Sequence, residues 1–222
     1  MTVIEVMLLL FVGGVLAWLS QRWHSHWPKW IALITCVLSS VLMLPLYYQE
    51  STTVLNLAGA PSYWIEYVQY SWIPRFGIGL IFALDGLSLM MISLTLFLGF
   101  VAILSSWTEI SERPGFFQFN LLWTLAGVIG VFSSLDLFLF FFFWEVMLIP
   151  MYFLIAIWGH EQRAYAAMKF FIFTQFSGLL MLVAILTLVL VNAEQSGQLT
   201  FNYFELVGHN LGSALSLLVM LG

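Results

Sequence analysis

Long apolar runs alternate with short polar segments along the whole chain. A helix needs about 20 mainly apolar residues to cross the hydrocarbon core of a bilayer. Six runs have that length and composition, and we expect each to form a membrane-spanning helix: Val3–Leu19, Trp30–Tyr48, Leu80–Ser105, Phe117–Ser134, Leu137–Trp158 and Phe170–Val191. A seventh run begins at Ser213 and reaches Gly222 after about ten residues, which is too short to span. The pattern predicts an all-α, polytopic membrane helix bundle, and we expect the sequence to be the N-terminal part of a longer protein.

The composition agrees with a membrane environment and excludes several classes of protein. Of the 222 residues, 62% are hydrophobic and 8% are charged, whereas a soluble domain carries about 25% charged residues. Only six residues are Lys or Arg, too few for nucleic-acid binding. The single cysteine, Cys36, lies in an apolar run, so we expect no disulfide and no thiolate metal site. With four histidines and no CxxC motif, we expect no cofactor in this chain.

The positions of the basic residues predict the orientation in the membrane. Lys and Arg concentrate in cytoplasmic loops. Five of the six follow the first, third and fifth runs: Arg22, Lys29, Arg113, Arg163 and Lys169. The other connections contain Arg75 alone, so we expect a multi-pass protein of the bacterial inner (plasma) membrane with a periplasmic N-terminus. The longest connection, Gln49–Gly79, should pack along the outer membrane surface. No segment has the pattern of a strand, so we expect neither a phosphate-binding loop nor a nucleophile elbow, which both follow strands.

One acidic residue inside a predicted span is the strongest candidate for chemistry. Glu145 lies eight residues after Leu137, about 12 Å from the outer end of its helix. An ionised carboxylate at that depth costs several kcal/mol unless it is paired, hydrated or protonated. A neutral glutamic acid that joins two helices is one interpretation, and a protonatable relay site is the interpretation that we favour. Pro150 removes one N–H and crowds the carbonyl of Val146, so a helix kink with a local water site can lie beside the carboxyl group.

Four other polar residues have plainer interpretations. Lys169 should open the sixth span, where it either extends to the headgroups or biases the protonation of an inner site. His160, just after the fifth span, is a candidate for proton entry because histidine titrates near neutrality, although a solvated loop histidine is the simpler account. Asp136 and Asp85 precede the fifth span and the body of the third, where each is expected to cap a helix N-terminus.

Several motifs together resemble one protein family over essentially the whole chain. They are Asp85-Gly-Leu-Ser-Leu, Trp144-Glu-Val-Met-Leu-Ile-Pro150-Met-Tyr-Phe-Leu-Ile, Trp158-Gly-His160, Lys169-Phe-Phe and Phe201-Asn-Tyr. The sequence is similar to the antiporter-like subunit M family of the bacterial respiratory NADH:quinone oxidoreductase, complex I. That family is itself similar to the large subunits of multisubunit cation/proton antiporters.

The resemblance implies a proton-translocating subunit with about fourteen helices, including two inverted five-helix repeats. The chain would then be a single membrane domain, with the first three helices in residues 1–115 and the start of the first repeat in residues 116–222. Flavin, iron–sulfur clusters, NADH and quinone would belong to partner subunits, with neighbouring antiporter-like subunits in contact. The family glutamate that aligns with Glu145 works with a lysine on the seventh helix, which this sequence does not reach. The alternatives are a subunit of a cation/proton antiporter, a membrane arm of a hydrogenase-type complex, or a structural spacer.

Overall fold

The computed structural model describes residues 2–24, 26–48, 52–55 and 61–206, and within them six helices are long and apolar enough to cross a membrane. They are α1 (Thr2–Ser20), α2 (Trp27–Met43, continued by a 3-10 helix over Leu44–Tyr48), α3 (Gly86–Glu109), α4 (Pro114–Ser133), α5 (Leu137–Trp158) and α6 (Arg163–Ser196). A short helix, α7, follows at Tyr203–Leu206. The predicted number of spans is confirmed, although the third and the sixth begin at other residues, and the seventh run from Ser213 lies outside the described residues.

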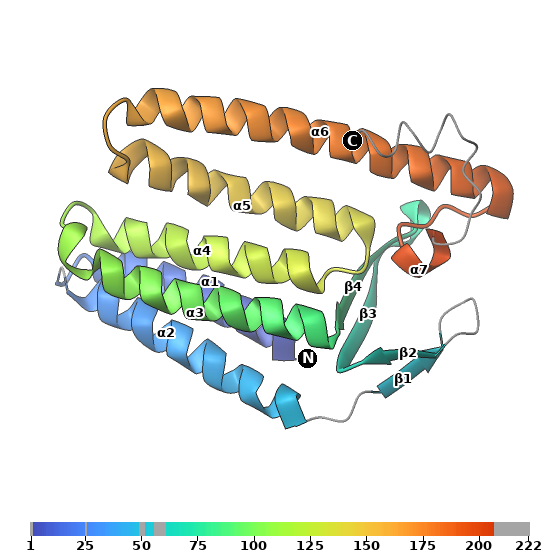
Figure 1. The fold of residues 1–222 in the computed structure, drawn as a ribbon, viewed down its shortest axis with the longest axis horizontal. Coiled ribbons are helices and arrows are strands. Elements are labelled where there is room, and N and C mark those ends of the chain that lie inside the picture. The colour runs from blue at the N-terminus through green and yellow to red at the C-terminus, as the bar shows by residue number, and fades with distance from the viewer. Residues whose placement is uncertain (1, 25, 49–51, 56–60, 207–222) are drawn as a thin grey trace.

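The six long helices lie side by side, and successive connections alternate between the two ends of the bundle (Figure 1). The α1–α2, α3–α4 and α5–α6 connections gather at one end, and the start of α1 lies at the other, together with the strands. The five basic residues that follow the odd-numbered spans therefore belong to the same end. We call it the basic end, and the other the hairpin end.

The expectation of a chain without strands is wrong. The described residues contain two antiparallel hairpins, β1 (Thr52–Leu55) with β2 (Pro61–Trp64), and β3 (Glu66–Ile73) with β4 (Ile78–Leu84). The third span does not begin at Leu80, because that apolar run starts as β4 and becomes α3 only after Asp85. A short apolar run that is buried on both sides has no periodicity that separates strand from helix. The pairing of β4 with β3, through a turn in which Gly77 has a φ of 68°, decides it.

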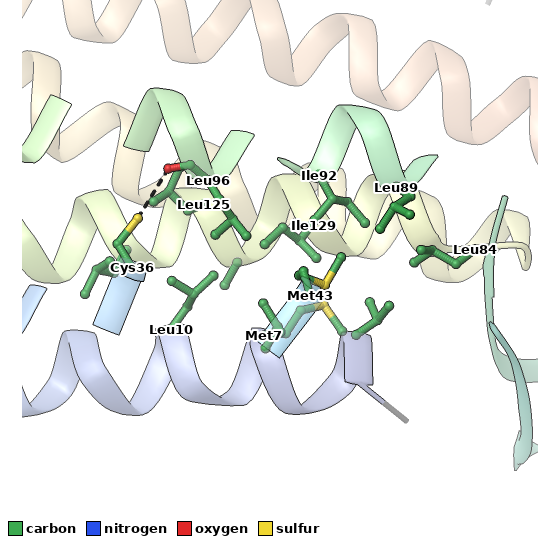
Figure 2. Close-up of a cluster of buried hydrophobic side chains, with 14 of the residues drawn as sticks. Met7, Leu10, Cys36, Met43, Leu84, Leu89, Ile92, Leu96, Leu125 and Ile129 are labelled. Atoms are coloured by element: carbon green, nitrogen blue, oxygen red, sulfur yellow. Dashed lines mark hydrogen bonds between the residues drawn. The ribbon is translucent and has the colours of Figure 1, made fainter. Parts of the chain in front are cut away.

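α4 lies at the centre of the bundle and contacts α1, α2, α3 and α5, whereas α6 packs along α5. The main core cluster joins these central helices (Figure 2): Met7, Leu10, Cys36, Leu96, Leu125 and Ile129. The Cys36 thiol donates a hydrogen bond to the carbonyl of Leu96 at 3.3 Å, also drawn in Figure 2. Much of the outer surface is apolar, as on Phe97 of α3 and Phe173 of α6. Such a surface suits lipid as its solvent.

Asp136 caps α5 and ties it to the hairpin end, which confirms its predicted role. Its Oδ1 accepts hydrogen bonds from the N–H groups of Phe138 (2.9 Å) and Leu139 (3.1 Å), and its Oδ2 accepts one from Gly79 of β4 (3.0 Å). Complete burial raises the pKa of this carboxyl group, and the three N–H donors oppose that rise. Asp85 is confirmed as a cap too, since its Oδ1 accepts from the Ser88 N–H at 2.7 Å.

Candidate functional site

Glu145 lies on the side of α5 that faces α6, and one of its carboxyl oxygens is buried there. Oε1 is buried and has no hydrogen-bond partner within the described part of the chain. On α6 it lies against Gly178, which is itself buried. A Cβ atom at Gly178 would lie closer to Oε1 than real Cβ contacts allow. The missing side chain at Gly178 therefore provides the room that the carboxyl group of Glu145 occupies.

This environment restricts the chemistry available to the carboxyl group. A buried carboxyl oxygen without a hydrogen-bond donor costs free energy. Oε1 therefore lacks a contact that a cation or a water molecule can supply. Trp144, beside Glu145 in α5, also approaches Gly178, with its Cδ1 4.0 Å from the Cβ position there. Trp144 and Glu145 therefore both lie against Gly178.

Pro150 is buried inside α5, and the helix continues through it to Trp158. The ring nitrogen of proline carries no hydrogen, so Pro150 donates nothing to the carbonyl of Val146. That carbonyl belongs to the residue directly after Glu145. The helix kink and the water site beside the acid stay predictions.

The structure does not bring Lys169 or His160 to Glu145. The prediction that Lys169 opens the sixth span is wrong, since α6 begins at Arg163, about 9 Å earlier along the helix axis. Its side chain is exposed, with Nζ 5.9 Å from the centre of the Tyr165 ring, within the range of a cation–π contact. Lys169 precedes Gly178 by nine residues, or about 13 Å along α6. His160 is exposed in the short connection between α5 and α6.

The sequence reasoning missed three buried polar side chains near the basic end. Gln118 and Asn120 of α4 are almost completely buried, and the Gln118 Oε1 has no hydrogen-bond partner among the described residues. Lys29 is only 7% exposed, and its Nζ donates to the carbonyl of Trp107 at 2.6 Å. The two amides were visible as polar residues within an apolar run, whereas Lys29 was used only for orientation. Gly178 gave no signal, because nothing in the sequence indicates which helix Glu145 faces.

Comparison with known proteins shows which family the chain resembles. The model of the family described as "NADH:quinone oxidoreductase/Mrp antiporter, TM" matches residues 134–222. The NADH-quinone oxidoreductase subunit M of Escherichia coli strain K12 is 51% identical over 222 residues, or 98% of this chain and 43% of that protein. Over this length the chain is similar to the subunit M family. It is a multi-pass membrane protein of the antiporter-like fold, and it spans less than half the length of this subunit M relative.

Solved structures agree with this family. A chain of respiratory complex I from Thermus thermophilus with bound NADH superposes on all of this chain and 42% of its own length, with a TM-score of 0.80 at 27% identity. A chain of the Mrp complex from Dietzia sp. DQ12-45-1b also covers all of this chain, and 23% of its own length, with a TM-score of 0.77. At 17% identity the second likeness concerns the fold alone. The Mrp chain thus shares the fold, whereas the identity to the complex I chain is the higher of the two.

Proposed function

We propose that the protein is a proton-translocating, non-redox subunit of the membrane arm of NADH:quinone oxidoreductase, and that Glu145 is its central proton relay. The observation that carries the proposal is the sealed Oε1 of Glu145 against the backbone of Gly178. For an acid without a partner between two membrane helices, the free-energy cost of the carboxylate falls when a cation or water approaches. The cost rises again when that cation or water leaves. Such a group couples a movement of charge elsewhere in the complex to uptake or release of a proton.

In this proposal the other candidate residues act along the path rather than at the relay. Lys169 is a secondary group, whose charge about 13 Å along α6 biases the protonation of Glu145. His160, exposed at the basic end, takes up protons. Pro150 places a free carbonyl next to the relay. The basic end faces the cytoplasm, which puts the N-terminus in the periplasm.

Electron transfer is assigned to partner subunits, which would hold the flavin, the iron–sulfur clusters, NADH and the quinone. Neighbouring antiporter-like subunits of the membrane arm are the expected contacts. A cation/proton antiporter subunit is the second candidate function, supported by the family description and by the shared fold of the Mrp chain. The 51% identity to a subunit M, against 17% to the Mrp chain, favours complex I.

The proposal is tested by Glu145→Gln and Glu145→Asp in the complete complex in its native membrane. Gln keeps the size and removes the exchangeable proton, so NADH oxidation with quinone and the proton gradient should both be largely lost while the complex assembles. Asp keeps the proton but shortens the side chain, so both activities should be partly retained. Glu194→Gln is the matched control, because Glu194 is an exposed acid near the end of α6.

A second arm moves the carboxyl group by one helical turn in the Gln background. Phe141 and Ile149 lie on about the same side of α5 as Glu145. Phe141 packs against the cluster that contains Ile185 of α6, whereas Ile149 is 46% exposed. A glutamate at position 141 should therefore restore more activity than one at position 149. Near-normal electron transfer and proton pumping in Glu145→Gln would show that this residue is a packing acid, and the proposal would be wrong.

A further inference from the structure

A surface cavity of about 570 Å³ lies at the basic end, between the last turn of α1 and the first turn of α4. The cavity is separate from the proposed relay, and the inference drawn from it does not depend on the role of Glu145. Six residues line it: Trp18, Leu19, Gln21, Arg22, Arg113 and Phe116. The cavity therefore combines two guanidinium groups with two aromatic rings at the level where a span ends.

The two arginines differ from the other cations at this end in having no partner. Arg163 donates through Nη1 to the carbonyl of Ile157, and Lys29 donates to the carbonyl of Trp107. Within the described residues, neither Arg22 nor Arg113 has a side-chain hydrogen bond or an ion pair. A guanidinium group offers five N–H donors in a planar fork that matches the oxygens of a phosphate. Two such groups therefore line one cavity without an ion pair among the described residues.

The backbone at Arg113 gives an independent reason to look for a role of its side chain. Arg113 caps α4 in the left-handed region, with φ 49° and ψ 51°. That conformation costs a residue with a Cβ atom about 1 kcal/mol, and glycine or asparagine would adopt it more readily. The backbone at this position therefore does not favour arginine over glycine or asparagine.

The apolar part of the cavity suits the region of a lipid just below its phosphate. The rings of Trp18 and Phe116 pack together with their centres 5.9 Å apart, and Trp18 is 48% exposed. Aromatic side chains with one polar edge favour the interfacial layer of a bilayer. Gln21 uses its Oε1 to accept the Gly115 N–H at 3.1 Å, so its amide N–H groups stay available as donors.

We propose that this cavity binds the phosphate headgroup of an anionic phospholipid in the leaflet at the basic end. Arg22 and Arg113 bind the phosphate oxygens, and Trp18 and Phe116 contact the glycerol and the first methylenes of the chains. The two positive charges select an anionic over a zwitterionic headgroup, since each basic side chain near the surface favours anionic lipid. The cavity lies where α1 ends and α4 begins, which is the level of the lipid headgroups. A membrane lipid therefore matches the site better than a free ion does.

The test uses the complete complex in nanodiscs with two photoactivatable lipids that carry the same chains, phosphatidylglycerol and phosphatidylcholine. Peptide mass spectrometry should find phosphatidylglycerol attached to the segments that contain Trp18 and Phe116, and far less phosphatidylcholine. In Arg22→Gln/Arg113→Asn, the preference for phosphatidylglycerol should fall by about 30-fold. That is the fold-change expected when two basic side chains near an anionic membrane surface are removed. Arg75→Gln is the matched control, because it removes one exposed cation at the hairpin end, and it should label as the wild type does.

Each other outcome decides against the proposal. Equal labelling by both lipids, or labelling unchanged in the double variant, would show that the arginines do not select the headgroup. Suppression by millimolar inorganic phosphate would identify a free-phosphate site. The absence of labelled peptides in the wild type would mean that a neighbouring subunit fills the cavity. If the double variant does not assemble, Arg113→Asn alone decides, because asparagine fits the left-handed backbone, and unchanged labelling in it overturns the proposal.

Discussion

The clearest energetic prediction concerns Asp136, which holds three N–H groups from two parts of the chain. Asp136→Ala leaves Phe138, Leu139 and Gly79 without their acceptor in a site with no exposed surface. The loss of the helix cap costs about 1 kcal/mol. The loss of the charge-assisted bond from Gly79 to a buried carboxylate costs about 2 kcal/mol more. We expect the free energy of unfolding to fall by about 3 kcal/mol.

Two comparisons separate the free-energy contribution of the helix cap from that of the hydrogen bond between Gly79 of β4 and Asp136. Asparagine caps helices as well as aspartate does, but Asp136→Asn presents only one acceptor oxygen, so it should cost about 2 kcal/mol. Asp85→Ala removes a cap that accepts one hydrogen bond, from Ser88, and should cost about 1 kcal/mol. The measurement is unfolding of the complete protein in mixed detergent micelles. If Asp136→Ala destabilises no more than Asp85→Ala, the contact between Asp136 and β4 contributes nothing and the reasoning is refuted.

Three further predictions follow from the same structure. Gly178→Ala pushes a methyl group against the carboxyl group of Glu145, so the pH profile of proton pumping should shift while assembly is kept, and an unchanged profile would remove Gly178 from the site. Because burial raises the pKa of Asp136 above its usual value of 3.8, the native state binds its proton more tightly. Stability should therefore fall as the pH rises from about 3.8 through the raised pKa and then level off, a trend that unfolding titrations should not find in Asp136→Asn. A reporter tag after Gln162 should read as cytoplasmic, and a periplasmic signal would contradict the orientation.

The sequence by itself determined the features that depend on neighbours along the chain. Hydropathy over about 20 residues is enough to recognise a span, because a lipid-facing helix satisfies its backbone hydrogen bonds internally. Six spans follow from that alone. The caps at Asp85 and Asp136 were predictable for a similar reason, since a cap binds N–H groups two or three residues away. The motif around Glu145 likewise carried the resemblance to the family.

Tertiary structure decided the rest, because the partners lie far apart in the sequence. The run Ile78–Leu84 is a strand only because β3 lies beside it to accept its hydrogen bonds. Glu145 faces Gly178 because α5 and α6 pack at one particular rotation, which no periodicity in two uniformly apolar helices specifies. Arg22 and Arg113 share a cavity because α1 packs against α4. Apolar pattern fixes which segments enter the membrane, and close packing between them fixes which polar groups meet there.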